Sequence, residues 1–335
     1  MTDTPSAATP TAYLGIDIAK ASFEVVLQDG PRRCGHGFSN DAAGFDALSG
    51  WLARQGAGRV WAVQEATGRY GEALANYLTQ QGHTVSVVNP LRIKAYGESQ
   101  LRRAKTDRGD AALMAAFGRS HALPRWTPPS PEQQQLRDLV RRVADLQQMR
   151  QQERNRLEAG TYSSFVADSL QTVLDVLAAQ IQALQQAIQT HVQAYPALQR
   201  TRQLLTSIPG IGSLTATRLM VELPDIQAFT TPKQLVAYAG LAPAVHQSGT
   251  SVHRRAHTSR KGNAVLRAQL FMPALVALRH NPVIQALQQR LQRAGKAKMV
   301  IVVAAMRKLL HLVYGILKSG RPFDPVLALS PGPGA

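Results

Sequence analysis

The sequence has almost no cysteine and no recognisable export leader. Cys34 is the only cysteine among 335 residues, so a disulfide cannot form within the chain. The first ten residues, MTDTPSAATP, lack the charged and then apolar pattern of a secretory signal. We therefore expect the protein to work in a reducing cytoplasm.

Apolar runs long enough to cross a bilayer are also missing. The most apolar late stretch, MVIVVAAM from Met299, runs directly into Arg307 and Lys308. It is too short for a membrane span, which needs about 20 apolar residues. We expect a buried helix here and no membrane partner.

Acidic residues are absent from position 226 to position 323, within a chain of net charge +17. A uniformly basic segment attracts polyanions, and each phosphate it neutralises releases counterions. A merely solubilising surface normally mixes both signs, so nucleic acid is the favoured partner. The basic residues of this segment are Lys233, Arg254, Arg255, Arg260, Lys261, Arg267, Arg279, Arg290, Arg293, Lys296, Lys298, Arg307, Lys308, Lys318 and Arg321.

Length and composition predict two or three domains, each with its own core. The run WTPPSP at residues 126–131 breaks the helical pattern and marks a boundary. After it, segments such as LQTVLDVLAAQIQALQQAI space their apolar residues as in long helices that pair with each other or with another protomer. The expected divisions are a disordered tail at 1–12, a first domain at 13–127, coiled-coil helices at 128–198, a third domain at 199–326 and a second tail at 327–335.

The first domain has an α/β pattern. YLGIDIA, FEVVLQ and RRCGHGFSN predict a three-strand meander, followed by a helix that Asn40 or Asp41 could cap and that runs through Leu52. RVWAVQEA and HTVSVVNP predict two more strands, separated by a helix from Tyr70 to Gln81, and a helical stretch containing KTDRGDAA comes next. This is the element order of a ribonuclease H-like domain, although ATPase domains of the actin and sugar-kinase type begin similarly.

Four acids fall at informative points of this pattern. Asp17 lies inside the first strand, Glu65 ends the strand RVWAVQEA, and Asp107 and Asp110 share one helical face. In a ribonuclease H-like sheet the first and fourth strands are neighbours and the last helix packs beside them, so the four carboxylates should converge. Converging carboxylates repel unless divalent cations neutralise them, and hard oxygen ligands select Mg²⁺ or Mn²⁺. Two such ions can clamp a phosphodiester.

The two helix acids also have ordinary structural explanations. Asp107 could be a helix N-cap behind Thr106, and Asp110 a solvated acid in the first turn. The letters of Arg108, Gly109 and Asp110 also spell a cell-adhesion tripeptide, but that ligand needs export and an exposed loop. For either of these two acids taken alone the structural explanation is favoured, whereas all four acids together favour a site.

The motif Ile208-Pro209-Gly210-Ile211-Gly212 lies between two helical runs. It matches a helix-hairpin-helix, in which Gly210 and Gly212 would let backbone N–H groups approach a phosphate. A tight turn between helices with no ligand is the alternative.

At this point the chain resembles a known family, the DEDD-type insertion-sequence transposases, which are bridge-RNA-guided DNA recombinases. The resemblance is carried in family order from about Tyr13 to Asp324 by GIDIAK, QEATGRY, VVNP, AKTDRGDAALMA, SIPGIG, FTTPKQLVAYAGLAP, SGTSVHRR, LRAQLFMPALVA and KMVIVVAAMRKLLHLVYGILKSGRPFD. It implies a RuvC-like domain, a coiled-coil connection and a mainly helical transposase domain. It also implies a bacterial protein of the cytoplasm associated with the nucleoid.

The resemblance implies a DEDD tetrad at Asp17, Glu65, Asp107 and Asp110 and a nucleophilic serine at Ser248. It further implies a tetramer assembled around a bridge RNA that pairs with donor and target DNA. From the residues alone Ser248 has no priority, because SGTS is also an ordinary turn. Downstream candidates for phosphate contacts are Arg254, Arg255, Arg260 and Lys261.

Other activities remain open on the sequence. A RuvC-like nuclease would use the four acids and a metal-activated water, without the serine. A decayed element would leave a scaffold that binds nucleic acid without chemistry. An ATPase is disfavoured because no second phosphate-binding glycine motif is recognisable.

Overall fold

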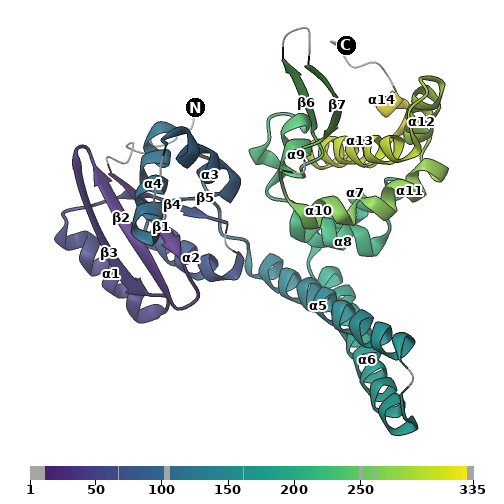
Figure 1. The fold of residues 1–335 in the computed structure, drawn as a ribbon, viewed down its shortest axis with the longest axis horizontal. Helices are drawn as coiled ribbons and strands as arrows, with labels where there is room; N and C mark the ends of the chain where they lie inside the picture. The colour runs from purple at the N-terminus through teal and green to yellow at the C-terminus, as the bar shows by residue number, and fades with distance from the viewer. Residues whose placement is uncertain are drawn as a thin grey trace. The chain divides into compact units, whose positions relative to one another are not determined.

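The chain divides into two compact units, Met1–Pro128 and Pro129–Ala335. The computed structural model describes residues 12–66, 68–101, 106–160, 162–248, 252–259 and 261–329 (Figure 1). Each unit has its own hydrophobic core.

A five-stranded sheet forms the centre of the first unit, with the strand order β3-β2-β1-β4-β5. The first three strands make the expected antiparallel meander, while β1, β4 and β5 run parallel. The strands are β1 (Ala12–Ile18), β2 (Ser22–Asp29), β3 (Arg32–Ser39), β4 (Val60–Glu65) and β5 (Thr84–Val88).

Helices cover both faces of this sheet. One face packs its apolar residues against α1 (Ala42–Arg54) and α2 (Glu72–Gln80). The other packs against α3 (Pro90–Ser99) and α4 (Asp107–Ser120). The strands of a sheet that is covered on both faces have nearly continuous apolar sequences, as in the strand LGIDI. This arrangement is consistent with a ribonuclease H-like fold.

Local sequence sets where the helices begin. Of the two cap candidates for α1, Asp41 is the cap, since its carboxylate accepts from the backbone N–H of Gly44 at 2.8 Å. The stretch expected as one helix around KTDRGDAA is two helices, and the second begins at Asp107 with Thr106 as its cap. A short 3-10 turn, η1 (Gly68–Gly71), precedes α2 where we expected helix from Tyr70.

Two long helices, α5 (Pro131–Ala159) and α6 (Ser164–Ala194), pair at the start of the second unit (Figure 1). Apolar residues at helical spacing form their shared core. Those of α5 are Leu136, Val140, Val143 and Leu146, and those of α6 are Leu177, Ile181, Ile188 and Val192. The spacing in the sequence identified this pair correctly.

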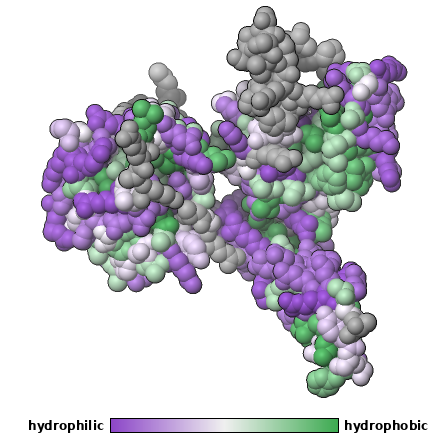
Figure 2. Space-filling model, viewed as in Figure 1, coloured by the Kyte–Doolittle hydropathy of each residue, from purple (hydrophilic) through white to green (hydrophobic). Residues whose placement is uncertain are grey.

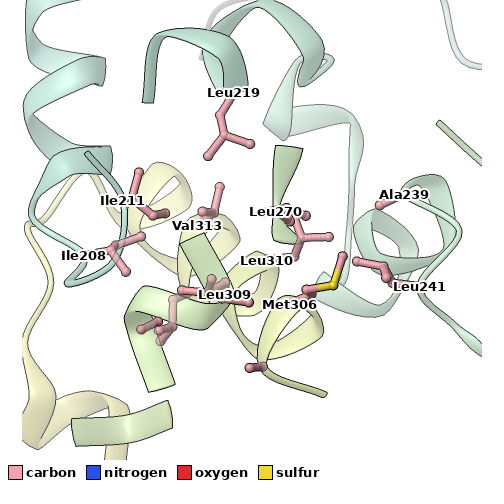
Figure 3. Close-up of a cluster of buried hydrophobic side chains, with 14 of the residues drawn as sticks. Ile208, Ile211, Leu219, Ala239, Leu241, Leu270, Met306, Leu309, Leu310 and Val313 are labelled. Carbon is pink, nitrogen blue, oxygen red and sulfur yellow. The ribbon is translucent and has the colours of Figure 1, made fainter. Parts of the chain in front are cut away.

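The remainder of the second unit surrounds one central helix, α13 (Lys298–Ser319). Leu309, Leu310 and Val313 of this helix are fully buried against side chains from several neighbouring helices (Figure 3). α13 is long and apolar enough to cross a membrane, so the expectation that this stretch is too short for a membrane span was wrong. Half of its most apolar 18 residues are buried, which agrees with the buried helix expected from the sequence. Around it lie α7 (Pro196–Thr206), α8 (Ser213–Glu222), η2 (Ile226–Ala228), α9 (Pro232–Tyr238), α10 (Ala264–Gln269), α11 (Phe271–His280), α12 (Pro282–Arg293) and α14 (Pro325–Leu329).

Two features of the second unit differ from the sequence expectations. An antiparallel hairpin, β6 (Pro243–Ser248) and β7 (Val252–Thr258), interrupts the otherwise helical unit. The helix α14 extends to Leu329, past residue 327 where we expected a tail to begin. The hairpin was missed because PAVHQS and VHRRAHT have little of the apolar alternation that predicts strands.

The close packing of α4 on β1 can be tested by measuring the stability of the first unit. An added Cβ at Gly15 would come within 1.9 Å of the Ala111 carbonyl oxygen and 2.4 Å of the Ala115 nitrogen. Gly15→Ala should therefore lower the free energy of unfolding by about 3 kcal/mol, because α4 must shift. All three tryptophans, Trp51, Trp61 and Trp126, lie in the first unit, so tryptophan fluorescence during urea unfolding isolates its stability.

Gly58→Ala is the matched control, because nothing lies within 4 Å of its added Cβ. Its unfolding free energy should change by less than about 1 kcal/mol. Equal stability of the Gly15 and Gly58 variants would contradict close packing of α4 on β1.

Candidate active site

Asp17 and Glu65 occupy corresponding positions on two adjacent strands. The parallel pairing of β1 with β4 ends at Ile16 opposite Gln64, so Asp17 and Glu65 are the next residue on each strand. Both are half-buried at the carboxyl end of the strands. The acids of the first and fourth strands thus reach the same edge of the sheet.

The helix α4 crosses the sheet face on which these two acids lie. Its Gly118 packs against Tyr13 and Val63, and its Ala111 and Ala115 pack against Gly15. The helix therefore runs antiparallel to β1, from Asp17 back toward Tyr13.

This direction determines how far along the sheet, measured parallel to β1, the helix acids lie. Two strand residues, from Gly15 to Asp17, advance about 6.7 Å. Four helical residues, from Ala111 back to Asp107, advance about 6 Å. Asp107 and Asp110 consequently lie at the end of α4 that is level with Asp17.

The four acids suit a hard divalent cation by chemistry and by backbone position. Carboxylate oxygens are the donors that Mg²⁺ and Mn²⁺ prefer. Among the residues that the structure describes, however, no three His, Cys, Asp or Glu side chains are gathered closely enough to hold a metal ion. The backbone brings the acids to one end of the sheet, and their side chains are not collected around a single point.

The first turn of α4 is anchored independently of its acids. Thr106 caps the helix by accepting from the Gly109 backbone N–H at 3.1 Å, so Asp107 is not the cap. Arg108 donates to the Gly35 carbonyl oxygen of β3 at 3.4 Å. Arg108 thus ties the acidic turn to the far side of the meander.

Two side-chain amides secure the backbone beyond the strand acids. Asn40 donates to the Ala19 carbonyl oxygen at 3.0 Å and to the Tyr70 carbonyl oxygen at 3.1 Å. Buried Gln64 donates to the Gly71 carbonyl oxygen at 3.0 Å. These bonds tie the segment after Asp17 to the turn η1 that follows Glu65. Sequence reasoning considered Asn40 only as a helix cap, and no local pattern reveals bonds to carbonyls so distant along the chain.

Ser248 is the last residue of β6 and lies opposite Val252 of β7. Residues 249–251, and with them the rest of the SGTS turn, lie outside the described part of the chain. Arg254 and Arg255 follow in β7, Arg260 is outside the described residues, and Lys261 is exposed. Ser248 belongs to the second unit, whereas the four acids belong to the first.

The IPGIG segment forms a turn between α7 and α8, and its two glycines have different surroundings. Gly210 has φ +106°, and an added Cβ would lie 2.7 Å from the Ala277 Cβ of α11. Gly212 precedes α8 as its N-cap residue, and nothing lies within 4 Å of its added Cβ. Gly210 therefore has a packing role, while Gly212 leaves the start of α8 accessible.

Basic residues of α9, α12 and α13 lie near one another in the second unit. Burial lowers the pKa of Lys308, and nearby Arg290 lowers it further. Burial also lowers the pKa of His311, with additional repulsion from Arg307, Lys308 and Lys233. Crowding of like charges costs stability, and a bound polyanion would relieve it.

Two family models match this chain. A model of DEDD transposases of IS110 elements, described as a transposase, matches residues 14–160. A second, described as the transposase IS116/IS110/IS902 family, matches residues 202–289.

Curated relatives extend the match over nearly the whole chain. Pilin gene-inverting proteins of Moraxella bovis and Moraxella lacunata are each 36% identical over 319 residues, covering 93% of this chain and 97% of theirs. A transposase for insertion sequence element IS1111A of Coxiella burnetii is 40% identical over 78 residues, covering 23% of this chain and 21% of its own.

Because both halves match and full-length relatives share more than a third of their residues, the chain belongs to the IS116/IS110/IS902 family of transposases, enzymes that rearrange DNA.

Proposed function

We propose that this transposase cuts and rejoins DNA through a covalent link to Ser248, assisted by Mg²⁺ held by Asp17, Glu65, Asp107 and Asp110. The observation that carries the proposal is the full-length similarity to proteins described as inverting a gene. Inversion leaves every phosphodiester bond rejoined. A hydrolytic nuclease loses the bond energy to water, so it would need a separate source of energy for rejoining.

A serine–phosphate link conserves that energy. The Ser248 hydroxyl loses its proton as its oxygen attacks phosphorus, the bond to the 3′ oxygen breaks, and that leaving oxygen takes up a proton, so the protons balance. One DNA end is then joined to Ser248, and the other carries a free 3′ hydroxyl. Attack by an exchanged 3′ hydroxyl on the phosphoserine reverses the step and releases the serine, without ATP.

The four acids supply the environment for this exchange. A divalent cation bound there would stabilise negative charge on the phosphate and lower the pKa of the attacking hydroxyl. Asn40 and Gln64 hold the backbone that follows the strand acids, and Arg108 holds the start of α4. These bonds restrict where the carboxylates can move as they close on a cation.

The proposed nucleic-acid partners would be bound by the basic segment of the second unit. The acid-free segment from 226 to 323 supports binding of donor and target DNA together with a guiding bridge RNA. Gly212, Arg254, Arg255, Arg260 and Lys261 are the proposed phosphate contacts, while Gly210 would contribute only through the shape of its turn.

A tetramer would let the acids of one subunit meet Ser248 of another. Exposed apolar residues on α6 support such self-association: Phe165 is 83% exposed and Val176 57%. Figure 2 shows hydrophobic surface near the far end of the α5–α6 pair. Such side chains in water favour burial against a second copy.

Ser248→Ala tests the covalent step. With Mg²⁺, donor and target DNA and the bridge RNA, the wild type should form a denaturation-resistant protein–DNA adduct and recombinant product, and the variant should form neither. Thr258→Ala, at the far end of the hairpin, is the control. Cleavage without an adduct in the Ser248 variant would favour the nuclease, and undiminished exchange would exclude Ser248 as the nucleophile.

Asp110→Asn tests the tetrad, because it removes one charge with almost no change in size. Strand cleavage should fall by at least about a hundredfold, the effect typical of losing one stabilising group at a transition state. Asp29→Asn, at the exposed end of β2, should cleave normally. Gel assays with labelled DNA compare the two variants, and normal cleavage by Asp110→Asn would remove this residue from the catalytic set.

Phe165→Asp tests self-association through α6. Placing a charge on this exposed apolar surface should shift the protein to a lower mass in analytical ultracentrifugation. Gln180→Asp, an exposed polar position on the same helix, should leave the mass unchanged. An unaltered mass for both variants would place the subunit interface elsewhere.

A further inference from the structure

A cavity of about 290 Å³ opens in the second unit where α5, α6, α7 and α8 meet. Apolar side chains of Val140, Ile188 and Leu214 form part of its lining. Two cations, Arg202 of α7 and Arg218 of α8, also line it. An apolar lining beside two guanidinium groups suits a ligand with an apolar body and an anionic group.

The surroundings of the two arginines favour binding of such an anion. Arg218 is half-buried, and burial lowers its pKa because the charged form loses water. Its guanidinium donates to the Gln147 side-chain oxygen at 2.7 Å, which fixes its position with a neutral partner. Within the described parts of the chain, no carboxylate pairs with Arg202 or Arg218. A partly desolvated guanidinium with five N–H donors and no counter-ion favours an anion from outside.

The start of α8 contributes to the same place. Ser213, its first residue, lines the cavity, and the preceding Gly212 supplies no side-chain cap. The first N–H groups of a helix carry partial positive charge and lack partners within the helix. They add to the attraction of the two guanidinium groups, which carry the larger charge.

We propose that this cavity binds one unpaired nucleotide, with its phosphate between Arg202 and Arg218 at the start of α8 and its base against the apolar lining. The assignment rests on the proposed function, since it specifies how the nucleic-acid partner is held. Gln185 and Gln189 of α6 line the cavity and can donate to or accept from a base edge.

The size and chemistry of the cavity point to an unpaired nucleotide. Its volume is at the lower end of pockets for small ligands, which run from about 300 to 1,000 Å³, so a duplex cannot enter. In a duplex the bases are stacked inside and only phosphates and groove edges are presented. An unstacked base can lie on apolar and guanidinium surfaces, which is how single strands are commonly held.

Fluorescence anisotropy of the full chain with labelled oligouridylate, oligothymidylate and a short duplex tests the assignment. Arg202→Met and Arg218→Met each remove one charge while keeping a long side chain. Each should weaken binding of an unpaired strand about tenfold, as expected for loss of a charge-assisted hydrogen bond. The salt dependence of binding should also fall by about one counterion.

Arg200→Met is the matched control, because Arg200 is on the same helix, is exposed and does not line the cavity. It should change binding by less than about twofold, because its exposed guanidinium donates to the Gly320 carbonyl oxygen and not to a ligand in the cavity. Leu214→Trp provides a second variant that fills the cavity without altering charge, at an exposed position that tolerates size. It should weaken binding of the single strands and spare the duplex.

The assignment is overturned if Arg202→Met and Arg218→Met match Arg200→Met, or if duplex binding falls as much as single-strand binding. A larger loss with oligouridylate identifies an RNA nucleotide, and a larger loss with oligothymidylate identifies a displaced DNA strand. Because this assay involves no strand exchange, the cavity assignment can fail while the Ser248 adduct still forms.

Discussion

The close packing of α4 on β1 is the contact on which the arrangement of the acids depends. Gly15 has no side chain, so the α4 backbone at Ala111 and Ala115 approaches β1 directly. That contact fixes the direction of α4 and its position along β1. It therefore puts Asp107 and Asp110 at the same end of the sheet as Asp17. A larger residue at position 15 would separate two parts of the site without touching any acid.

The second unit differs from the first, since one apolar helix organises its core and a long segment around that helix has no acidic residue of its own. Leu309, Leu310 and Val313 bury α13 at the centre of the unit. The segment from 226 to 323 around this core contains lysines and arginines but no acidic residue of its own. Groups such as Lys308 and His311 are held among like charges, with their pKa values lowered. Nucleic acid would supply the missing negative charge.

Sequence patterns predicted those parts of the molecule that local chemistry determines. Alternating and continuous apolar runs gave the strands, helical spacing gave the α5–α6 pair, and acids at Asp17 and Glu65 stood out inside strands. Such local patterns could not predict contacts between residues that are far apart in the sequence. Nothing local marks Asn40 as a link between Ala19 and Tyr70, or Gly210 as a packing contact for Ala277. The hairpin that contains Ser248 was missed for the same reason, because its strands pair with each other without strong apolar patterns of their own.

The central claim is that acids from two strands and one helix form a single cation site, and Mn²⁺ binding tests it most directly. Electron paramagnetic resonance can follow Mn²⁺ titrated into wild type, Asp17→Asn, Asp110→Asn and the double variant. If both acids share one site, each single variant should weaken binding at least about tenfold, and the double variant should lose much less than the product of the two effects. Affinities that match Asp29→Asn in every variant would contradict the claim.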